Sequence, residues 1–283
     1  MTELHLYQTV HVAGGRPRQV RAHAALLTGA ARMLFGCDYA PDVRMLESRI
    51  AALARAERYP QSVSGFVRIE VAPDGTERLR PAGLSFYKGY ALRSLTPDAR
   101  VVRCEIPHIE LPTSGREALH LLADCRARSL GADIAVCADR QGICHSADSA
   151  PLFAVRGKEV LVSPLSLPEC DGTMSAVSGE GSGTAGASAD GASPDNPAAA
   201  PELFAPGTAT PAFRSVELET ALHAIRAAGL TLREEPVRQT ELDRYDELFY
   251  VDHRGVTALA HCDGTAYMSL AAERIAAAME RMF

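Results

Sequence analysis

Lysine is almost absent from this sequence of 283 residues, in which Lys88 and Lys158 are the only two. The remaining 27 of the 29 basic residues are arginines, which stay charged at any usable pH and cannot form Schiff bases. Any chemistry that needs a lysine amine therefore has two candidates at most in this chain.

Other absences limit the class of protein. The seven cysteines form no CxxC pair and are odd in number, which favours reduced thiols and a cytoplasmic setting over a disulfide framework. We expect no signal peptide and no membrane span, because no basic N-terminal segment precedes an apolar core and no apolar run reaches about 18 residues. The net charge of -6 gives no electrostatic reason to expect nucleic acid, and the Cys and His spacing matches no standard zinc pattern, so no metal is expected.

Hydrophobic periodicity predicts two domains, an N-terminal α+β domain over residues 1–95 and a strand-rich C-terminal α/β domain over residues 101–283. Gly36 marks the end of a helix, and Asp74–Gly75 is a good hairpin signal between two strands. The predicted N-terminal elements are a strand in "ELHLYQTVHV", a short strand at 18–21, helices at 22–35 and 42–57, and the two hairpin strands. The predicted C-terminal helices are 115–129, 216–228 and 268–282, with strands between them.

The stretch "LPTSGREALHLL" predicts the start of an amphipathic helix. Ser114 and Glu117 have the spacing of a capping box, in which the serine hydroxyl accepts from first-turn amides and the glutamate reaches back. Leu119, Leu122 and Cys125 recur at helical spacing and predict the buried face of this helix.

A low-complexity segment interrupts the second domain. Residues 171–210 contain seven glycines, five acids, no Lys or Arg, and few large apolar side chains. Such a composition cannot bury enough surface to offset chain entropy, so we predict a disordered insertion over residues 171–212.

Limited proteolysis tests this prediction. We expect cleavage to concentrate within residues 171–212, and deletion of residues 172–208 to leave the melting temperature nearly unchanged, because loop length enters stability only logarithmically. Resistance to protease throughout the segment in a folded sample would contradict it.

The order and spacing of several segments resemble those of a known enzyme family. They are "GGRPRQVRAHAALLTGAARMLFG", "SLGADIAVCADRQG" leading into "PLFAVRGKEVLVSP", "ALHAIRAAGLTLREEPV" and "LDRYDELFYVDHRGVTAL". Together they resemble the class-IV aminotransferases, the fold-type-IV pyridoxal-phosphate enzymes, which include branched-chain and D-amino-acid aminotransferases and aminodeoxychorismate lyase. The resemblance implies a two-domain α/β architecture and a homodimer.

The family's cofactor anchors are missing at the matching positions. The family holds pyridoxal phosphate by a lysine, a phosphate-binding arginine, a glutamate on the pyridine nitrogen, and amides at a helix start. The resemblance places the lysine at Pro112, the arginine at Leu26 and the glutamate at Ser146, and an asparagine of the family's hairpin at Pro151. The helix start has become "PAFRSVELE", and no lysine occurs between residues 89 and 157.

Three hypotheses for function follow from the resemblance. In the first, the protein is a degenerate member of the family that binds a ligand or a partner without catalysis, and no cofactor is expected. In the second, it is an active aminotransferase or lyase that uses pyridoxal phosphate and another lysine, for which Lys88 is the candidate. In the third, a lysine-independent enzyme has reused the cleft, so whether the chain is an enzyme stays open at this point.

The resemblance also implies which residues wall the cleft. An Arg–His pair in the loop after "DELFYVD" could bind a small anionic ligand, although a charged loop that packs at a dimer edge has the same composition. Thr113 and Ser114 replace the lysine region and could equally be helix caps. The candidate ligand-binding residues are Thr113, Ser114, Ser146, Asp148, Asp252, His253 and Arg254.

Overall fold

A computed structural model describes residues 4–90, 96–106, 111–164 and 214–282 of the chain. These residues belong to one structural unit that contains two sheets. The predicted domain boundary near residue 95 and the predicted disordered insertion at 171–212 lie outside the described residues, and both stay predictions.

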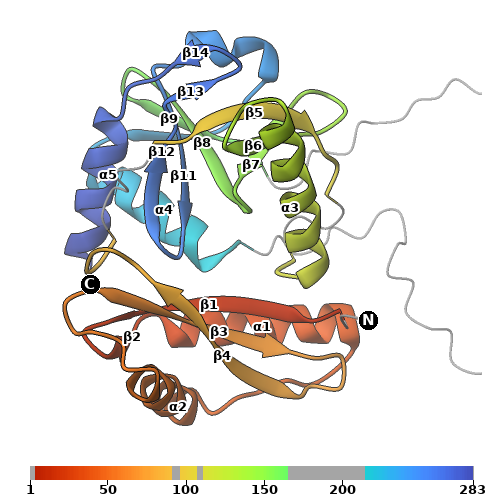
Figure 1. Cartoon of the computed structure of the whole chain (residues 1–283), viewed down its shortest axis with the longest axis vertical. Helices are drawn as coiled ribbons and strands as arrows, with labels where there is room; N and C mark the ends of the chain where they lie inside the picture. The colour runs from red at the N-terminus through yellow and green to blue at the C-terminus, as the bar shows by residue number, and fades with distance from the viewer. Residues whose placement is uncertain (1–3, 91–95, 107–110, 165–213, 283) are drawn as a thin grey trace, which may run out of the picture. The chain divides into compact units, whose positions relative to one another are not determined.

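The N-terminal sheet is antiparallel, with strand order β2-β1-β3-β4. Helices α1 and α2 cover one of its faces (Figure 1), where alternate residues of β1, Leu6, Val10 and Val12, join one apolar core with side chains of both helices. The elements are β1 (Leu6–Ala13), β2 (Arg16–Pro17), α1 (Val20–Phe35), α2 (Val43–Ala56), β3 (Ser64–Val71) and β4 (Glu77–Leu84).

The intervening residues of β1 and β3 point to the opposite face, because successive side chains of a strand alternate. The pairing register places Tyr7 opposite Glu70 and Thr9 opposite Arg68. This face is polar although it is largely buried, and it forms one wall of the candidate site described below.

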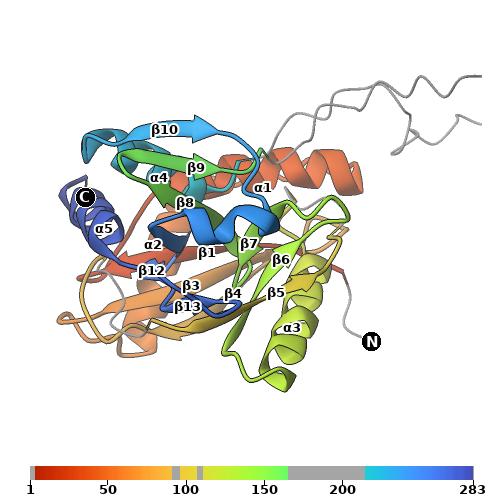
Figure 2. The same ribbon diagram turned by 90° about the horizontal axis from the view of Figure 1, so that it is seen from above.

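The C-terminal strands form a mixed sheet in which β8 pairs with β7, β9 and β11. Figure 2 shows β8, β9 and β10 side by side. Helices α4 and α5 share an apolar core with β8 and β11, while α3 packs on β5 and β6. The strands are β5 (Asp98–Arg103), β6 (Ile134–Ala138), β7 (Cys144–Ala147), β8 (Ala150–Arg156), β9 (Glu159–Val162), β10 (Thr231–Glu234), β11 (Glu247–Asp252), β12 (Gly255–Ala258), β13 (His261–Cys262) and β14 (Thr265–Ala266). The helices are α3 (Ser114–Ser129), α4 (Val216–Ala227), the 3-10 helix η1 (Gln239–Arg244) and α5 (Leu270–Arg281).

The mixed α/β fold and all five long helices were predicted from the sequence, and the structure confirms them. The predicted short strand at 18–21 is wrong, because the strand is Arg16–Pro17 and Gln19 takes a left-handed conformation, φ 54°, that ends it before α1. Strands β5 and β7 were not assigned in the sequence.

Helix α3 differs from its prediction in both its cap and its buried face. Thr113, not Ser114, is the N-cap, and its Oγ1 accepts from the Arg116 amide at 3.0 Å. Leu122 is 66% exposed, whereas the polar residues His120 and Asp124 face inward. They can do so because each meets a partner there, as when the Asp124 carboxylate accepts from a backbone amide of β6.

Candidate functional site

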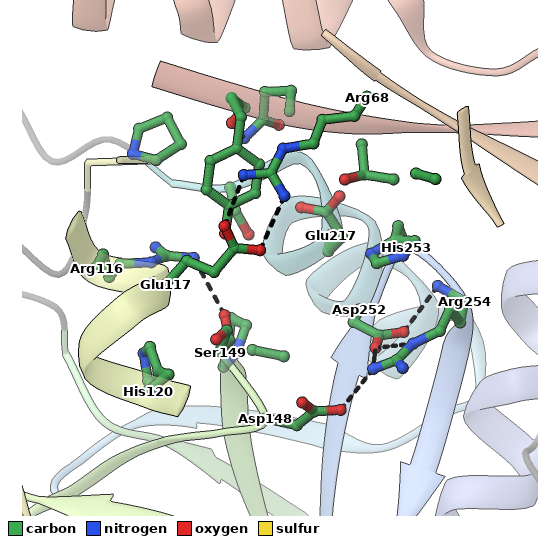
Figure 3. Close-up of a pocket in the computed structure, with 18 of the residues that line it drawn as sticks. Arg68, Arg116, Glu117, His120, Asp148, Ser149, Glu217, Asp252, His253 and Arg254 are labelled. Atoms are coloured by element: carbon green, nitrogen blue, oxygen red, sulfur yellow. Dashed lines mark hydrogen bonds and ion pairs between the residues drawn. The ribbon is translucent and has the colours of Figure 1, made fainter. Parts of the chain in front are cut away.

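A cavity of about 550 Å³ lies against the polar face of the N-terminal sheet. Its lining comes from β1, β3 and β4, the first turns of α3 and α4, and two hairpin turns of the C-terminal sheet. Figure 3 shows charged side chains from these elements pointing toward one another. Segments far apart in the sequence therefore meet at one concave, polar site, which is the usual form of a small-molecule site.

Two tight turns supply one side of the cavity. Asp148 and Ser149 join β7 to β8, and both take left-handed φ values, 46° and 62°, as a two-residue hairpin turn requires. His253 and Arg254 join β11 to β12 in a second two-residue turn, between the paired residues Asp252 and Gly255. The Arg254 guanidinium bridges the two turns, because it donates to Asp148 Oδ2 at 2.5 Å and to Asp252 Oδ2 at 2.6 Å (Figure 3).

This bridge keeps Asp252 ionised in a buried position. Burial by itself would raise the pKa of Asp252, but the adjacent His253 and Arg254 together hold that pKa below its ordinary value. The same contacts raise the pKa of Arg254. The guanidinium is thus held by two carboxylates and is not presented to a ligand as an isolated positive charge.

The wall from the N-terminal sheet contains a second arginine–carboxylate pair. Arg68 donates to both carboxylate oxygens of Glu117 on α3, at 2.9 and 2.6 Å, and its guanidinium carbon lies 3.7 Å from the centroid of the Tyr7 ring. A bidentate pair stacked on an aromatic face is rigid, so it fixes the first turn of α3 against β1 and β3.

The inner face of α3 adds Arg116 and His120, which are four residues apart and so share one side of the helix. Arg116 donates to the carbonyl of Ser149 at 3.1 Å. His120 is 2% exposed, and its Nε2 has no hydrogen-bond partner within the described segments. Burial lowers the pKa of His120 to about 3, so its ring is neutral at physiological pH.

The start of α4 contributes a carboxylate. Ser215 is the N-cap and accepts from the Leu218 amide at 3.1 Å, and Glu217 in the first turn lines the cavity. Burial raises the pKa of Glu217, and the nearby charge of Asp252 raises it further, while Arg116 and the Ser215 hydroxyl lower it. Because the pKa stays raised, these two groups compensate the desolvation of this carboxylate only in part.

A hydrogen-bond network positions the β11–β12 turn from behind. His11 Nδ1 donates to the carbonyl of His253 at 3.0 Å, and its Nε2 lies 2.6 Å from Ser64 Oγ, which also accepts from the Gly89 amide. Burial lowers the pKa of His11 to about 4. Because His11 and Ser64 are both at most 1% exposed, this pair holds backbone in place and does not contact a ligand.

Five of the seven ligand-binding candidates from the sequence line the cavity, namely Ser146, Asp148, Asp252, His253 and Arg254. Thr113 and Ser114 do not, because Thr113 caps α3 and Ser114 Oγ accepts from the His5 amide at 3.1 Å. Lys88 is exposed beside Gly14 and also lies outside the lining, and Lys158 is exposed in the β8–β9 turn.

Sequence reasoning missed most of the charged lining. The missed polar and charged residues include Tyr7, Arg68, Glu70, Arg80, Arg116, Glu117, His120, His145 and Glu217. A signal existed in the polar residues at alternate positions of the first and third strands, but such alternation usually marks a solvent-facing side.

The positions matched to the cofactor anchors also belong to the cavity. Leu26, Pro112, Ser146 and Pro151 all line it, and no lysine does so among the residues that the structure describes. Pro112 is buried, and its carbonyl accepts from the Tyr7 amide at 2.8 Å. Over the same residues, no group of three metal-ligating side chains is placed to hold a metal ion, and no helix has the length and apolarity to cross a bilayer.

No protein-family model matches this sequence, and the curated proteins include no significant match to it. Solved structures do match. A branched-chain aminotransferase from Thermoproteus uzoniensis superposes with a TM-score of 0.70 at 17% identity, over 99% of this chain and 85% of that one. A Brucella abortus aminotransferase bound to pyridoxal phosphate matches with a TM-score of 0.67 at 14% identity, over 98% and 88%.

A third match is a putative 4-amino-4-deoxychorismate lyase from Legionella pneumophila, with a TM-score of 0.65 at 11% identity, over 93% of this chain and 85% of that one. The chain has the fold of the class-IV aminotransferases. Because these identities are low, the shared fold does not by itself show that this chain catalyses the reactions of its structural neighbours.

Proposed function

We propose that this protein binds a small ligand in the cavity of a class-IV aminotransferase fold and does not carry out pyridoxal-phosphate chemistry. The observation that supports this proposal most directly is that Leu26, Pro112 and Ser146 line the cavity, at the positions where the resemblance places three cofactor-binding residues. Three separate contacts to one cofactor are thereby missing from one site.

The residues present do not fit pyridoxal phosphate. Pro112 has no side-chain amine. Its fixed φ, and the hydrogen bond that its carbonyl accepts from the Tyr7 amide, leave this segment little freedom to bring another residue into the cavity. Leu26 cannot pair with a phosphate, and Ser146 cannot hold a protonated pyridine nitrogen as a glutamate does. The loss of two charge-assisted contacts of about 1.5–3 kcal/mol each weakens binding by a factor of roughly 10² to 10⁴.

The placement of the two lysines supports the same proposal. Lys88 and Lys158 are both exposed, and neither lines the cavity. A lysine that acts as a nucleophile near neutral pH needs a lowered pKa, which requires burial or a cationic neighbour. An active enzyme that depends on Lys88 would therefore need a different arrangement of residues 85–90.

A reconstitution experiment tests the proposed function. The purified protein is incubated with excess pyridoxal phosphate, gel-filtered, and examined by visible absorption, then treated with borohydride and mapped by mass spectrometry. We expect no retained absorption band and no reduced adduct, because neither lysine lines the cavity. An aminotransferase that retains its lysine, treated in parallel, is the positive control.

A retained band together with a reduced adduct on Lys88 would overturn the proposal and favour the aminotransferase alternative. An adduct on the exposed Lys158 alone would indicate nonspecific labelling, and the Lys158→Arg variant should abolish it. The homodimer implied by the resemblance stays a prediction beside this proposal.

A further inference from the structure

The start of α4 carries a negative charge where the resemblance places the phosphate group of a cofactor. Glu217 occupies the first turn of the helix, and the cavity lining beside it includes Leu218, Asp252 and His253. A helix N-terminus normally attracts anions through its free amides and its dipole. Here the Ser215 hydroxyl accepts a hydrogen bond from one of these amides, that of Leu218, and Glu217 places a carboxylate beside the others.

Glu217 has no ion-pair partner among the residues that the structure describes, and no dashed line reaches it in Figure 3. The acids elsewhere in the cavity are paired, since Glu117 and Glu70 meet Arg68, and Asp148 and Asp252 meet Arg254. Among the described lining residues, Glu217 is thus the one carboxylate that faces the cavity without an ion pair.

The groups around Glu217 compensate its charge only in part. Arg116 on α3 and the Ser215 hydroxyl favour the ionised form, but burial and the charge of Asp252 outweigh them and leave the pKa of Glu217 raised. Arg254 is shared between two other carboxylates. The His120 ring across the cavity is neutral, so it offers no positive charge of its own. A phosphate dianion placed here would meet Glu217 at close range with no free arginine assigned to it.

We infer that the cavity takes up a small organic amine in its protonated form, with Glu217 as the counter-ion of the ammonium group. This inference rests on the proposed function, because it requires a cavity that no cofactor fills. An ammonium group supplies three donors and one positive charge, which match a desolvated carboxylate that has no ion-pair partner. The start of α4, where the resemblance places a cofactor phosphate, would then bind a cation in this chain and not an anion.

Calorimetric titration of the full-length protein tests the inference. The cationic probes are n-butylamine and 1,4-diaminobutane, the neutral probe is 1-butanol, and the anionic probes are inorganic phosphate and pyridoxal phosphate. We expect the amines to bind, and neither the alcohol nor the anions to do so. In Glu217→Gln, which keeps the shape of the side chain, the affinity for the amines should fall roughly 10- to 100-fold.

Glu219→Gln is the matched control, because Glu219 lies in the same turn of α4 but pairs with Arg214 and does not line the cavity. It should leave amine affinity unchanged. Absence of amine binding, or equal binding by Glu217→Gln, would overturn the inference, and so would binding of inorganic phosphate that Glu217→Gln leaves intact. Each of these results leaves the proposed function standing, which only a pyridoxal-phosphate adduct on Lys88 would remove.

Discussion

Replacement of Phe249 by alanine should destabilise the fold by about 3–5 kcal/mol. Phe249 and Phe153 are directly paired residues of β11 and β8, both 0% exposed, and their rings stack at 5.0 Å with an interplanar angle of 7°. The substitution removes a large apolar side chain from a core shared with α4 and α5 and leaves a cavity beside Phe153. Such a loss is a large part of the 5–15 kcal/mol that typically stabilises a folded protein.

Urea unfolding followed by circular dichroism measures this effect. Phe249→Leu keeps most of the volume and should cost about 1–2 kcal/mol, so the two variants separate cavity formation from loss of the aromatic pair. A cost below about 1 kcal/mol for the alanine variant, with an unchanged dependence on urea, would show that this stack is not part of the stabilising core.

Removal of the Arg254 guanidinium should have the second largest effect, about 2–3 kcal/mol for Arg254→Ala at pH 7. The substitution leaves Asp252, which is 7% exposed, without its ion-pair partner, and it also disconnects the two hairpin turns. Arg254→Ala combined with Asp252→Asn should recover much of the loss, because it removes the uncompensated buried charge.

The pH dependence supplies an independent check on this prediction. In the wild type the pKa of Asp252 is lowered, so its ionised form adds stability at neutral pH, and this stability is lost as the pH falls through that pKa. In Arg254→Ala burial dominates and should raise the pKa, so the variant should gain relative to the wild type on acidification. The urea midpoints of the wild type and of Arg254→Ala should therefore differ less at pH 4 than at pH 7. An equal difference at the two pH values would contradict the role assigned to Arg254.

Local patterns in the sequence were sufficient to predict most of the helices and strands. Helix α1 ends at Gly36 with a left-handed φ of 64°, and α2 begins at Asp42, whose side chain accepts from two first-turn amides. Both are decided by interactions within a few residues, which a sequence displays directly. The predicted buried face of α3 was wrong because the partner that lets Asp124 turn inward, the Ala135 amide, belongs to a strand that follows later in the sequence.

The candidate site was predictable only in part for the same reason. Asp148 and Arg254 could be placed near one another through the resemblance, since each lies in a short turn at a matched position. The contact between Arg68 and Glu117 joins residues 49 positions apart on a strand and a helix, and no local pattern indicates it. Glu217 reads as an ordinary first-turn acid of a helix until the cavity around it is known.

The hydrogen bonds around His11 fix which atom is the donor and which is the acceptor in each of them. The carbonyl of His253 can only accept, so Nδ1 of His11 carries the proton and Nε2 is left as an acceptor. The hydroxyl of Ser64 must then direct its proton to Nε2 and receive the amide of Gly89 on a lone pair. Four segments distant in the sequence thus share one directed series of donors, in which no member can reverse without breaking a hydrogen bond. Lys88 directly precedes Gly89, so the backbone that carries this lysine is tied to Ser64 through the Gly89 amide.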